Sequence, residues 1–397
     1  MITCTELVPP DNSLRRSNPV LARLRLAASC LVVLMTGCDD GPADPGDPPR
    51  ILALESAAAR TCALLEGGSL WCWGAESGLE PKLFSGDLVV TDFALSNGGH
   101  PGGTCAVTAD QATRCWGYYL ALDLTYQYEG SPALLTDTLP LHALAAGSGH
   151  MCGIAADGSA NCWGSSVAGK RGHGAPPASG EWADLLVNRV AGGLQFTALA
   201  ASDVHTCGVT ITHDAWCWGY GPSLGDTDGT FHVTGEECFY VVGPCAWSPI
   251  HVSSLSGVVA LSVESSRSCA LLAAGAVWCW GPEASGDDWI AGSPVPVVLP
   301  EPASAVSVGT GFACALGTSG KVYCWGEPGP WRGTAAVTTT PAEVVTSLRF
   351  ATLTAAGRHT CGLDVDGIAW CWGQNNAGQL GDGTTITSAA PVRVAFD

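Results

Sequence analysis

Short apolar segments recur along the whole chain, and each is followed by a cysteine and a glycine-containing turn. Residues 141–147 and 350–357 are two such segments. Upstream of an apolar segment stands a shorter stretch led by proline, such as residues 293–297. Apolar runs of this length, bounded by Gly, Pro, Asn and Asp, are typical of β-strands. The pattern therefore predicts an all-β chain with about four short strands in each repeating unit.

The constant part of each unit is a cysteine, nine further residues and the tripeptide Cys-Trp-Gly, and it occurs seven times. The first cysteines of successive units stand 43 to 62 residues apart. A constant unit separated by variable connections indicates a repeat array, and about four strands per unit is the number found in a β-propeller blade. The seven pairs are Cys62 and Cys72, Cys105 and Cys115, Cys152 and Cys162, Cys207 and Cys217, Cys269 and Cys279, Cys314 and Cys324, and Cys361 and Cys371.

Each constant unit is predicted to form a β-hairpin. Its middle holds a three-residue connection with glycine, such as 156–158 or 365–367, which suits a type I turn followed by a bulge. In that register the two cysteines face each other at a non-hydrogen-bonded position, where Cα atoms approach to about 4.5 Å. The spacing therefore favours one disulfide in each hairpin. A metal site is the alternative, but zinc ligands usually stand two to four residues apart.

Residues 15–38 have the order of an export signal. Arginines precede the apolar run 26–35, which is too short to span a bilayer. The run ends in Leu34-Met-Thr-Gly-Cys38, which resembles the lipobox of bacterial lipoproteins. That resemblance implies that Cys38 is acylated and becomes the first mature residue. The alternative is a buried strand that ends in cysteine by chance.

The chain therefore divides into three predicted parts. Residues 1–37 are expected to be a signal peptide, and residues 38–49 the lipidated cysteine with a flexible tether rich in Pro, Gly and Asp. Residues 50–397 are expected to be the folded body. The predicted location is the bacterial cell envelope, outside the cytoplasm, with the membrane reached through the lipid anchor alone.

Export also accounts for the remaining cysteines. Cys4 and Cys30 leave with the leader and Cys38 is acylated, so the seven pairs then leave only Cys238 and Cys245. We expect these two to bond to each other. Pairing of all thiols in the folded body belongs to an oxidising compartment.

The charge of the chain restricts its partners. The formal net charge is −19, and the 397 residues include only three lysines. Such a surface repels phosphate backbones, which argues against a nucleic-acid partner. Charged residues make up only 13% of the chain, with 51 Gly and 25 Pro, a composition that fits short strands joined by many turns.

The last unit, residues 355–385, resembles the regulator of chromosome condensation repeat. That family forms seven-bladed β-propellers, so the resemblance implies a single seven-bladed propeller of four-stranded blades. The Gly-Gln-Leu-Gly stretch at 378–381 is intact in the last unit alone, with partial forms at 169–174 and 224–230. The other four units are expected to have lost it.

Closure of the ring is predicted from the two ends of the body. The first unit lacks a proline-led strand before it, whereas the chain ends with a spare one at 390–396. We expect this C-terminal strand to complete the first blade, because closure removes the edges that an open array would expose.

The resemblance implies the fold of the chain, but it does not imply the family's best-known activity. The family's best-known activity is nucleotide exchange on a nuclear small GTPase, and export, acidity and disulfides argue against it here. Secreted propellers of this type inhibit β-lactamases by covering the enzyme with one face of the ring. Because one fold carries many functions, this shows what the scaffold can do without naming the partner.

Three sets of side chains could carry chemistry, and each has a structural alternative that we favour. His150, His205 and His359 each stand two residues before a first cysteine, but equivalent positions around a ring do not converge on one metal. Residues 226–229 faintly resemble a calcium loop but lack most of its acidic ligands. The seven tryptophans after the second cysteines are expected to pack between blades. No metal or cofactor is expected.

The insertion at residues 230–247 departs from the repeat pattern and is rich in aromatic residues. Long loops on a rigid scaffold often carry function, and exposed aromatic residues are favoured at binding hot spots. We expect a recognition patch there, and the alternative is that the rings pack over the fourth blade. Its predicted members are Phe231, Phe239, Tyr240 and Trp247.

These observations favour a non-enzymatic interaction module, expected to be a monomer, that binds a protein or a surface polymer. No nucleophile elbow, phosphate loop or zinc helix signature is found in the sequence. The first alternative is a hydrolase or lyase with its site at the mouth of the central channel. The second is a structural envelope component without a discrete ligand.

Overall fold

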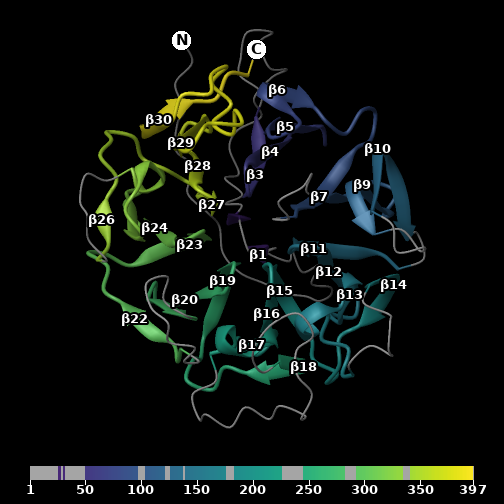
Figure 1. Cartoon of the computed structure of the whole chain (residues 1–397). Helices are drawn as coiled ribbons and strands as arrows, with labels where there is room; N and C mark the ends of the chain where they lie inside the picture. The colour runs from purple at the N-terminus through teal and green to yellow at the C-terminus, as the bar shows by residue number, and fades with distance from the viewer. Residues whose placement is uncertain are drawn as a thin grey trace, which may run out of the picture.

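The computed structural model describes residues 50–96, 103–120, 126–136, 139–175, 183–225, 245–281, 292–333 and 340–396, together with 26–27 and 30–31. In this part of the chain, seven antiparallel sheets of four strands stand side by side in a ring around a central channel (Figure 1). The fold class predicted from the sequence, a seven-bladed β-propeller, is confirmed. No helix in these ranges is long and apolar enough to cross a membrane.

Each blade runs from an inner strand beside the channel to an outer strand at the rim, in sequence order. The inner strands are β3 (Ile51–Ala57), β7 (Val90–Leu95), β11 (Leu141–Ala146), β15 (Phe196–Ala201), β19 (Val258–Glu264), β23 (Ala303–Gly309) and β27 (Thr354–Ala356). The second strands are β4 (Arg60–Leu65), β8 (Thr104–Thr108), β12 (His150–Ala155), β16 (His205–Thr210), β20 (Arg267–Leu272), β24 (Phe312–Gly317) and β28 (His359–Leu363).

The third and outer strands complete the blades. The third strands are β5 (Leu70–Gly74), β9 (Thr113–Leu120), β13 (Ala160–Ser165), β17 (Ala215–Tyr220), β21 (Val277–Trp280), β25 (Val322–Gly326) and β29 (Ala369–Gly373). The outer strands are β6 (Gly78–Leu83), β10 (Tyr126–Thr136), β14 (Ala183–Arg189), β18 (Cys245–His251), β22 (Val295–Val297), β26 (Ala342–Glu343) and β30 (Ser388–Arg393). Three 3₁₀ turns follow third strands: η1 (Val167–Gly169), η2 (Gly221–Ser223) and η3 (Pro330–Arg332).

The predicted role of the C-terminal strand is wrong in one respect. β30 pairs with β29, with Val392 opposite Cys371, so it completes the last blade rather than the first. The first blade obtains its outer strand β6 from its own unit, directly after β5. Each proline-led strand therefore belongs to the hairpin before it, not to the one after it. The first and last blades meet without exchanging a strand, through side chains and through a backbone hydrogen bond of 3.1 Å from the Gly383 amide to the Leu79 carbonyl.

The hairpin register is confirmed. Cys62 pairs with Cys72 and Ala63 with Trp71, which is the register that the three-residue turn predicts. The Leu65 amide donates to the Ser69 carbonyl at 2.9 Å, and counting back from this bonded pair places the cysteines at a non-hydrogen-bonded position. Seven disulfides, one in each blade, join the predicted pairs within the described residues, with Cα atoms 4.0 to 4.1 Å apart.

The core lies between neighbouring blades. Trp73, Trp218 and Trp372, each directly after a second cysteine, are fully buried. Trp218 of the fourth blade packs on Phe196, with ring centroids 5.8 Å apart, in a cluster that also contains Ile154 of the third blade. The predicted packing role of these tryptophans is confirmed for the six that are buried, and Trp325 is half-buried.

Prolines protect the exposed edges of the ring. An outer strand presents unpaired backbone groups, and proline removes one donor from such an edge. This is the physical reason for the proline-led stretches in the sequence. Prolines inside outer strands are Pro81, Pro132, Pro249, Pro296 and Pro391.

A small two-stranded ladder of β1 (Leu26–Ala27) and β2 (Cys30–Leu31) belongs to no blade. It comes from the predicted signal peptide. β1 lies beside the inner strands β15 and β19 at the centre of the ring (Figure 1).

Candidate functional site

The two faces of the ring differ in how the strands are joined. On one face, which we call the hairpin-tip face, lie the turns between second and third strands and the connections from each outer strand to the next inner strand. On the opposite face, the loop face, lie the turns between inner and second strands and the connections from third to outer strands. The antiparallel order of every blade places all members of each group at the same end.

The loop face holds the connections that vary most in length, because the outer-to-inner connections of the other face range only from four residues, at 137–140, to ten, at 344–353. The connection between third and outer strands takes three residues in the first blade, at 75–77, and 24 in the fourth, at 221–244. The hairpin turns of the other face keep the same spacing in all seven blades. Variable connections on a rigid scaffold are where binding surfaces are usually built, so the loop face is the candidate site.

The predicted aromatic patch is only partly described. Phe231, Phe239 and Tyr240 lie outside the described residues, as does the expected calcium-like stretch at 226–229. Trp247 is 4% exposed, so its ring is buried and is not part of an exposed surface patch.

The cysteine pair predicted for this insertion has one described member. Cys245 opens strand β18 and is disulfide-bonded. The partner expected for it, Cys238, lies outside the described residues. Cys38, the expected lipidation site, also lies outside them.

The three recurring histidines join neighbouring blades. His150 Nε2 shares a hydrogen bond of 2.8 Å with Thr206 Oγ1 of the next blade. His359 Nε2 shares one of 2.8 Å with Thr61 Oγ1, which links the last blade to the first. Each hydroxyl stands one residue before the first cysteine of its own blade, and His205 makes the same bond, of 2.7 Å, to Ser268. The predicted structural role of these histidines is confirmed.

Burial keeps these imidazoles neutral. It lowers the pKa of His359 to about 4 and that of His205 to about 3. Burial also holds the pKa of His150 well below its usual range, and the nearby Lys170 charge lowers it further. All three histidines therefore serve as neutral hydrogen-bonding groups at ordinary pH.

Sequence reasoning missed a fourth bond of the same kind. Arg60 occupies the histidine position of the first blade, and its Nη2 donates to Thr104 Oγ1 of the second. The next junction has Gly103 and Met151 at these two positions, so neither partner is polar. The sequence does carry a signal for these bonds. The residue two positions before the first cysteine of one unit bonds the residue one position before the first cysteine of the next unit.

The Gly-Gln-Leu-Gly stretch of the last blade, residues 378–381, lies between that blade and the first. We call this stretch the wedge loop. Gln379 O accepts a hydrogen bond of 3.1 Å from Trp73 Nε1. The degenerate forms keep this bond, because Lys170 O accepts from Trp218 Nε1 at 2.9 Å and Ser223 O accepts from Trp280 Nε1 at 3.0 Å. Backbone oxygens make these contacts, which explains why the side chains were free to change.

The sixth blade also keeps this loop, contrary to the expectation that four units had lost it. Residues 330–333 take its place, with the Trp331 carbonyl accepting from Thr360 Oγ1 at 3.0 Å. Gly333 has a φ of 63°, the left-handed conformation that favours glycine. Only this final glycine survives from the motif, so its signal in the sequence is weak.

A buried lysine lies between the third and fourth blades on this face. Lys170 Nζ donates to the carbonyl oxygens of Ser148 at 2.6 Å and Asp203 at 3.2 Å. Burial lowers the pKa of Lys170 to about 8, while the Asp203 carboxylate opposes that shift. The ammonium group thus ties two inner turns together at the mouth of the channel.

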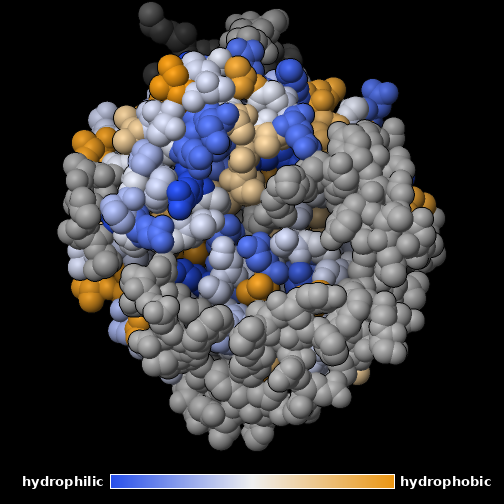
Figure 2. Space-filling model, viewed as in Figure 1, coloured by the Kyte–Doolittle hydropathy of each residue, from blue (hydrophilic) through white to orange (hydrophobic). Residues whose placement is uncertain are grey.

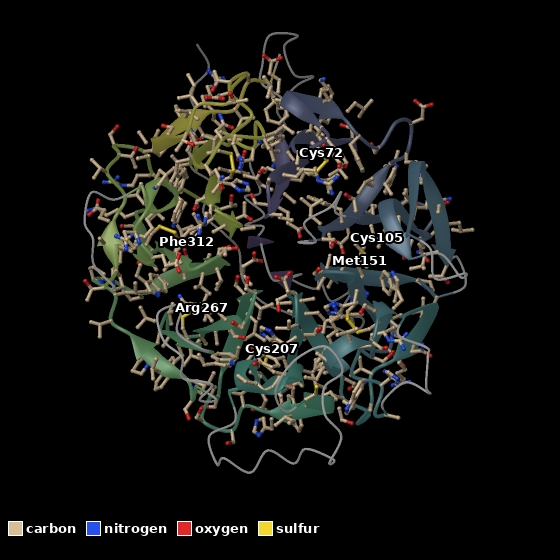
Figure 3. The ribbon with its side chains drawn as sticks, in the orientation of Figure 1. Cys72, Cys105, Met151, Cys207, Arg267 and Phe312 are labelled. Carbon is tan, nitrogen blue, oxygen red and sulfur yellow. A yellow bond between two sulfur atoms is a disulfide. The ribbon has the colours of Figure 1, made fainter. Side chains whose placement is uncertain are left out.

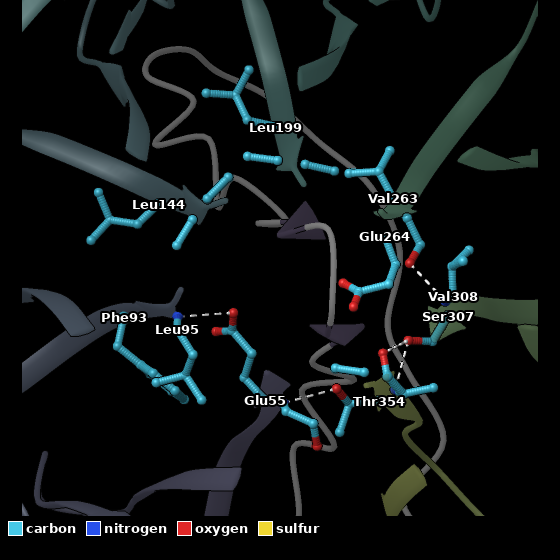
Figure 4. Close-up of a pocket in the computed structure, with 18 of the residues that line it drawn as sticks. Glu55, Phe93, Leu95, Leu144, Leu199, Val263, Glu264, Ser307, Val308 and Thr354 are labelled. Atoms are coloured by element: carbon cyan, nitrogen blue, oxygen red, sulfur yellow. Dashed lines mark hydrogen bonds between the residues drawn. The ribbon is translucent and has the colours of Figure 1, made fainter. Parts of the chain in front are cut away.

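The central channel has a polar side and an alanine side (Figure 4). At the inner-strand position that pairs with each first cysteine, four consecutive blades carry an acceptor that receives an amide of the next blade. Ser307 Oγ, for example, accepts from the Ala355 amide at 2.8 Å. The four acceptors are Glu55, Ser262, Ser307 and Thr354, and the other three blades carry Ala94, Ala145 and Ala200.

Two channel carboxyl groups are held neutral. Burial raises the pKa of Glu55 to about 8, with the Asp92 charge adding to the shift and the Leu95 amide opposing it. Burial likewise raises the pKa of Glu264 to about 8, with Asp203 adding to the shift. The carboxyls face the channel from opposite sides of the ring (Figure 4).

The space around these groups is small. With β1 of the predicted signal peptide beside β15 and β19, the channel cavity measures about 90 Å³, which is room for a few water molecules but below the size of an ordinary small-molecule site. Within the described ranges, no three His, Cys, Asp or Glu side chains are grouped as metal ligands. Figure 3 shows the disulfides lying within the blades, away from this cavity.

Comparisons with known proteins agree with this architecture. Residues 303–329 and 366–397 match the family model for the regulator of chromosome condensation (RCC1) repeat. No curated protein sequence matches the chain significantly.

Solved structures share the fold at low sequence identity. Human WBSCR16 aligns with a TM-score of 0.67 and 17% identity, over 80% of this chain and 85% of that one. Prp20p from Saccharomyces cerevisiae, described with its binding to Gsp1p and histones, aligns with a TM-score of 0.65 and 16% identity, over 88% of each chain. At such identity the likeness shows the fold alone.

Proposed function

We propose that this chain, a seven-bladed propeller with regulator of chromosome condensation repeats, is an exported, lipid-anchored interaction module whose loop face binds a protein or surface polymer. The observation that carries the proposal is the placement of the longest connections, up to 24 residues between β17 and β18, on one face of a rigid ring. Propellers of this repeat type typically act as scaffolds for protein interactions, and we assign no catalytic residue.

The rigidity of the ring supports this role. Each blade is pinned by a disulfide, and side-chain hydrogen bonds join one blade to the next, as between His205 and Ser268. A rigid scaffold lowers the entropy lost on binding, because the blades are already ordered.

Charge on the loop-face connections favours a cationic partner. Eight Asp or Glu and no Lys or Arg stand in the sequence segments 176–182, 226–244 and 282–291, which belong to connections between third and outer strands. Complementary charge raises the association rate and selects partners, and the effect weakens with salt. The eight are Glu181, Asp226, Asp228, Glu236, Glu237, Glu283, Asp287 and Asp288.

Trimming the fourth-blade insertion tests the proposal. Replacement of residues 226–244 by a short turn, with Cys245→Ser to avoid a free thiol, leaves strand β18 and the buried Trp247 in place. We expect affinity capture from envelope extracts and growth medium to lose its partner, while the circular dichroism spectrum and melting temperature stay close to those of the parent. Full partner capture by the trimmed protein would contradict this assignment.

A matched control separates the insertion from its disulfide. The double variant Cys238→Ser/Cys245→Ser keeps every other residue of the insertion. We expect it to retain most of the capture. Binding to the partner identified in this way should also weaken steadily between 50 and 500 mM salt, an outcome that a purely apolar contact would not produce.

The channel supplies the one observation that favours an enzyme as an alternative. Glu55 and Glu264 are buried carboxyls whose pKa values lie near 8, and such groups often mark acid–base sites. The Leu95 amide donates to Glu55 Oε1 at 3.2 Å, and Thr310 Oγ1 donates to Glu264 Oε1 at 3.2 Å. Both carboxyls therefore join neighbouring blades, which is a structural role. Turnover of an envelope glycan or peptide that is lost in Glu55→Gln and kept in the trimmed variant would favour the enzyme.

A further inference from the structure

The point where the tether enters the folded body lies on the hairpin-tip face. The Arg50 carbonyl accepts a hydrogen bond of 2.8 Å from the amide of Glu66, in the first hairpin turn. Their side chains also form an ion pair of 3.6 Å. Since β3 begins at the next residue and is an inner strand, the chain enters beside the channel axis rather than at the rim.

The tether is short compared with the body. Twelve residues, 38 to 49, separate the expected lipidated cysteine from Arg50. A flexible chain of that length has a root-mean-square reach of about 20 Å and a fully extended length of about 40 Å.

The path around the body is as long as the fully extended tether. From the axis to the rim, three strand spacings add about 14 Å, and the seven residues of β3 give the ring a depth of about 23 Å. These two lengths, before any side chain is added, already equal almost the whole extended tether and exceed its average reach.

We propose that the hairpin-tip face is turned toward the anchoring membrane, so that the loop face stays open to a partner arriving from the aqueous side. This rests on the proposed lipid anchor and adds the orientation of the binding face. An anchored ring cannot present its loop face to its own membrane, and the partner is a macromolecule that is soluble or held in a facing layer.

The chemistry of the hairpin-tip face suits proximity to an anionic surface. Several of its carboxylates have a cation beside them, as in the pairs Arg114–Asp110, Arg189–Asp157 and Lys321–Glu343. Aliphatic side chains are exposed between them, with Val298 at 85% and Val365 at 66%. Paired charges lessen the repulsion that unpaired carboxylates would feel.

Two variants, each with one cysteine added in the last blade, measure the orientation of the ring on the membrane directly. Val365→Cys follows strand β28 on the hairpin-tip face, and Arg358→Cys precedes the same strand on the loop face. Both native side chains are exposed. Each lipidated full-length protein is labelled with a donor dye and placed on phosphatidylethanolamine–phosphatidylglycerol vesicles that contain an acceptor-labelled lipid.

The expected result is a several-fold higher energy-transfer rate from position 365 than from position 358, because seven residues of strand separate them by about 23 Å. Ala274→Cys and Ser266→Cys, which flank β20 in the fifth blade, repeat the comparison at a second place in the ring. Equal transfer from the two ends, or higher transfer from the loop face, would overturn the proposal.

Lengthening the tether provides the matched control. Insertion of about 40 Gly/Ser residues more than doubles its average reach, and the difference between the two positions should then disappear. Flotation of the vesicles separates the two claims. Protein that does not float with the vesicles contradicts the lipid anchor and the orientation together, whereas protein that floats with equal transfer contradicts the orientation alone.

Discussion

At the residue scale, a few buried polar side chains join each blade to the next. Thr61 is fully buried and bonds both to His359 Nε2, at 2.8 Å, and to the Gln379 carbonyl, at 3.3 Å. A buried polar group that loses its partner keeps its desolvation penalty without compensation. Such bonds therefore matter more to the ring than their number implies.

The variant Thr61→Val should destabilise the protein by about 1–3 kcal/mol, because it leaves the His359 ring nitrogen without a partner at the junction that closes the ring. Chemical denaturation followed by tryptophan fluorescence measures the change. Thr91→Val is the control, since Thr91 is an exposed strand residue, and it should change the stability by less than about 0.5 kcal/mol. Equal effects of the two changes would show that the buried bond adds nothing.

Acid should destabilise the ring through its histidines. The folded-state pKa of His359, about 4, lies below its ordinary value of 6.5, so the unfolded chain binds more protons between these values. Stability is thus fully present above pH 6.5 and falls as the pH drops toward 4, by up to about 3 kcal/mol for this group. Melting temperatures of the parent and of Thr61→Val/His359→Leu between pH 7 and 4 test this, and the double variant should show the shallower loss.

The channel carboxyls should make the protein less stable at high pH, which is opposite to the effect of the histidines. The pKa of Glu55 is raised from its ordinary 4.5 to about 8, so its contribution is fully present below pH 4.5 and is lost as the pH rises through 8. Glu55→Gln keeps an oxygen for the Leu95 amide and removes the charge. We expect it to be more stable than the parent at pH 9 and close to it at pH 5. A variant that is less stable at both pH values would contradict the assignment.

At the element scale, the hairpins followed from local chemistry. The spacing of the cysteines, the glycine turn and the small residue opposite a ring, such as Ala63 opposite Trp71, all act within one hairpin, so the sequence predicted them correctly. The sequence predicts the wrong hairpin for the outer strands, because the partners of these strands are set by tertiary packing. β6 and β30 look alike in sequence, and only the structure shows that each pairs with the strand before it.

Removal of one hairpin disulfide should cost stability without changing the fold. The double variant Cys62→Ser/Cys72→Ser opens a short loop, for which loop-closure entropy gives about 3 kcal/mol. Differential scanning calorimetry under non-reducing conditions measures the loss. Unaltered stability would mean that the antiparallel pairing alone already fixes the hairpin.

At the scale of the whole molecule, the ring is held by contacts between units that one unit cannot reveal. The ring centroids of Phe396 and Trp73 lie 5.7 Å apart in an edge-on arrangement, and this contact joins the C-terminal segment to the first blade. The sequence predicted the number of blades and the closed ring. It did not predict which side chains join the blades, as with Arg60, or that the sixth blade keeps its wedge loop, because those residues acquire meaning only beside their neighbours.

The proposed location and the rigidity of the ring both depend on export and on a disulfide in every blade. Mass spectrometry of the mature protein, digested without reduction, tests this in one measurement. We expect an N-terminal peptide that begins at diacylated Cys38 and seven linked peptide pairs that join cysteines ten residues apart. An N-terminus at Met1, abundant free thiols or links between different blades would contradict an exported ring with one disulfide in each blade.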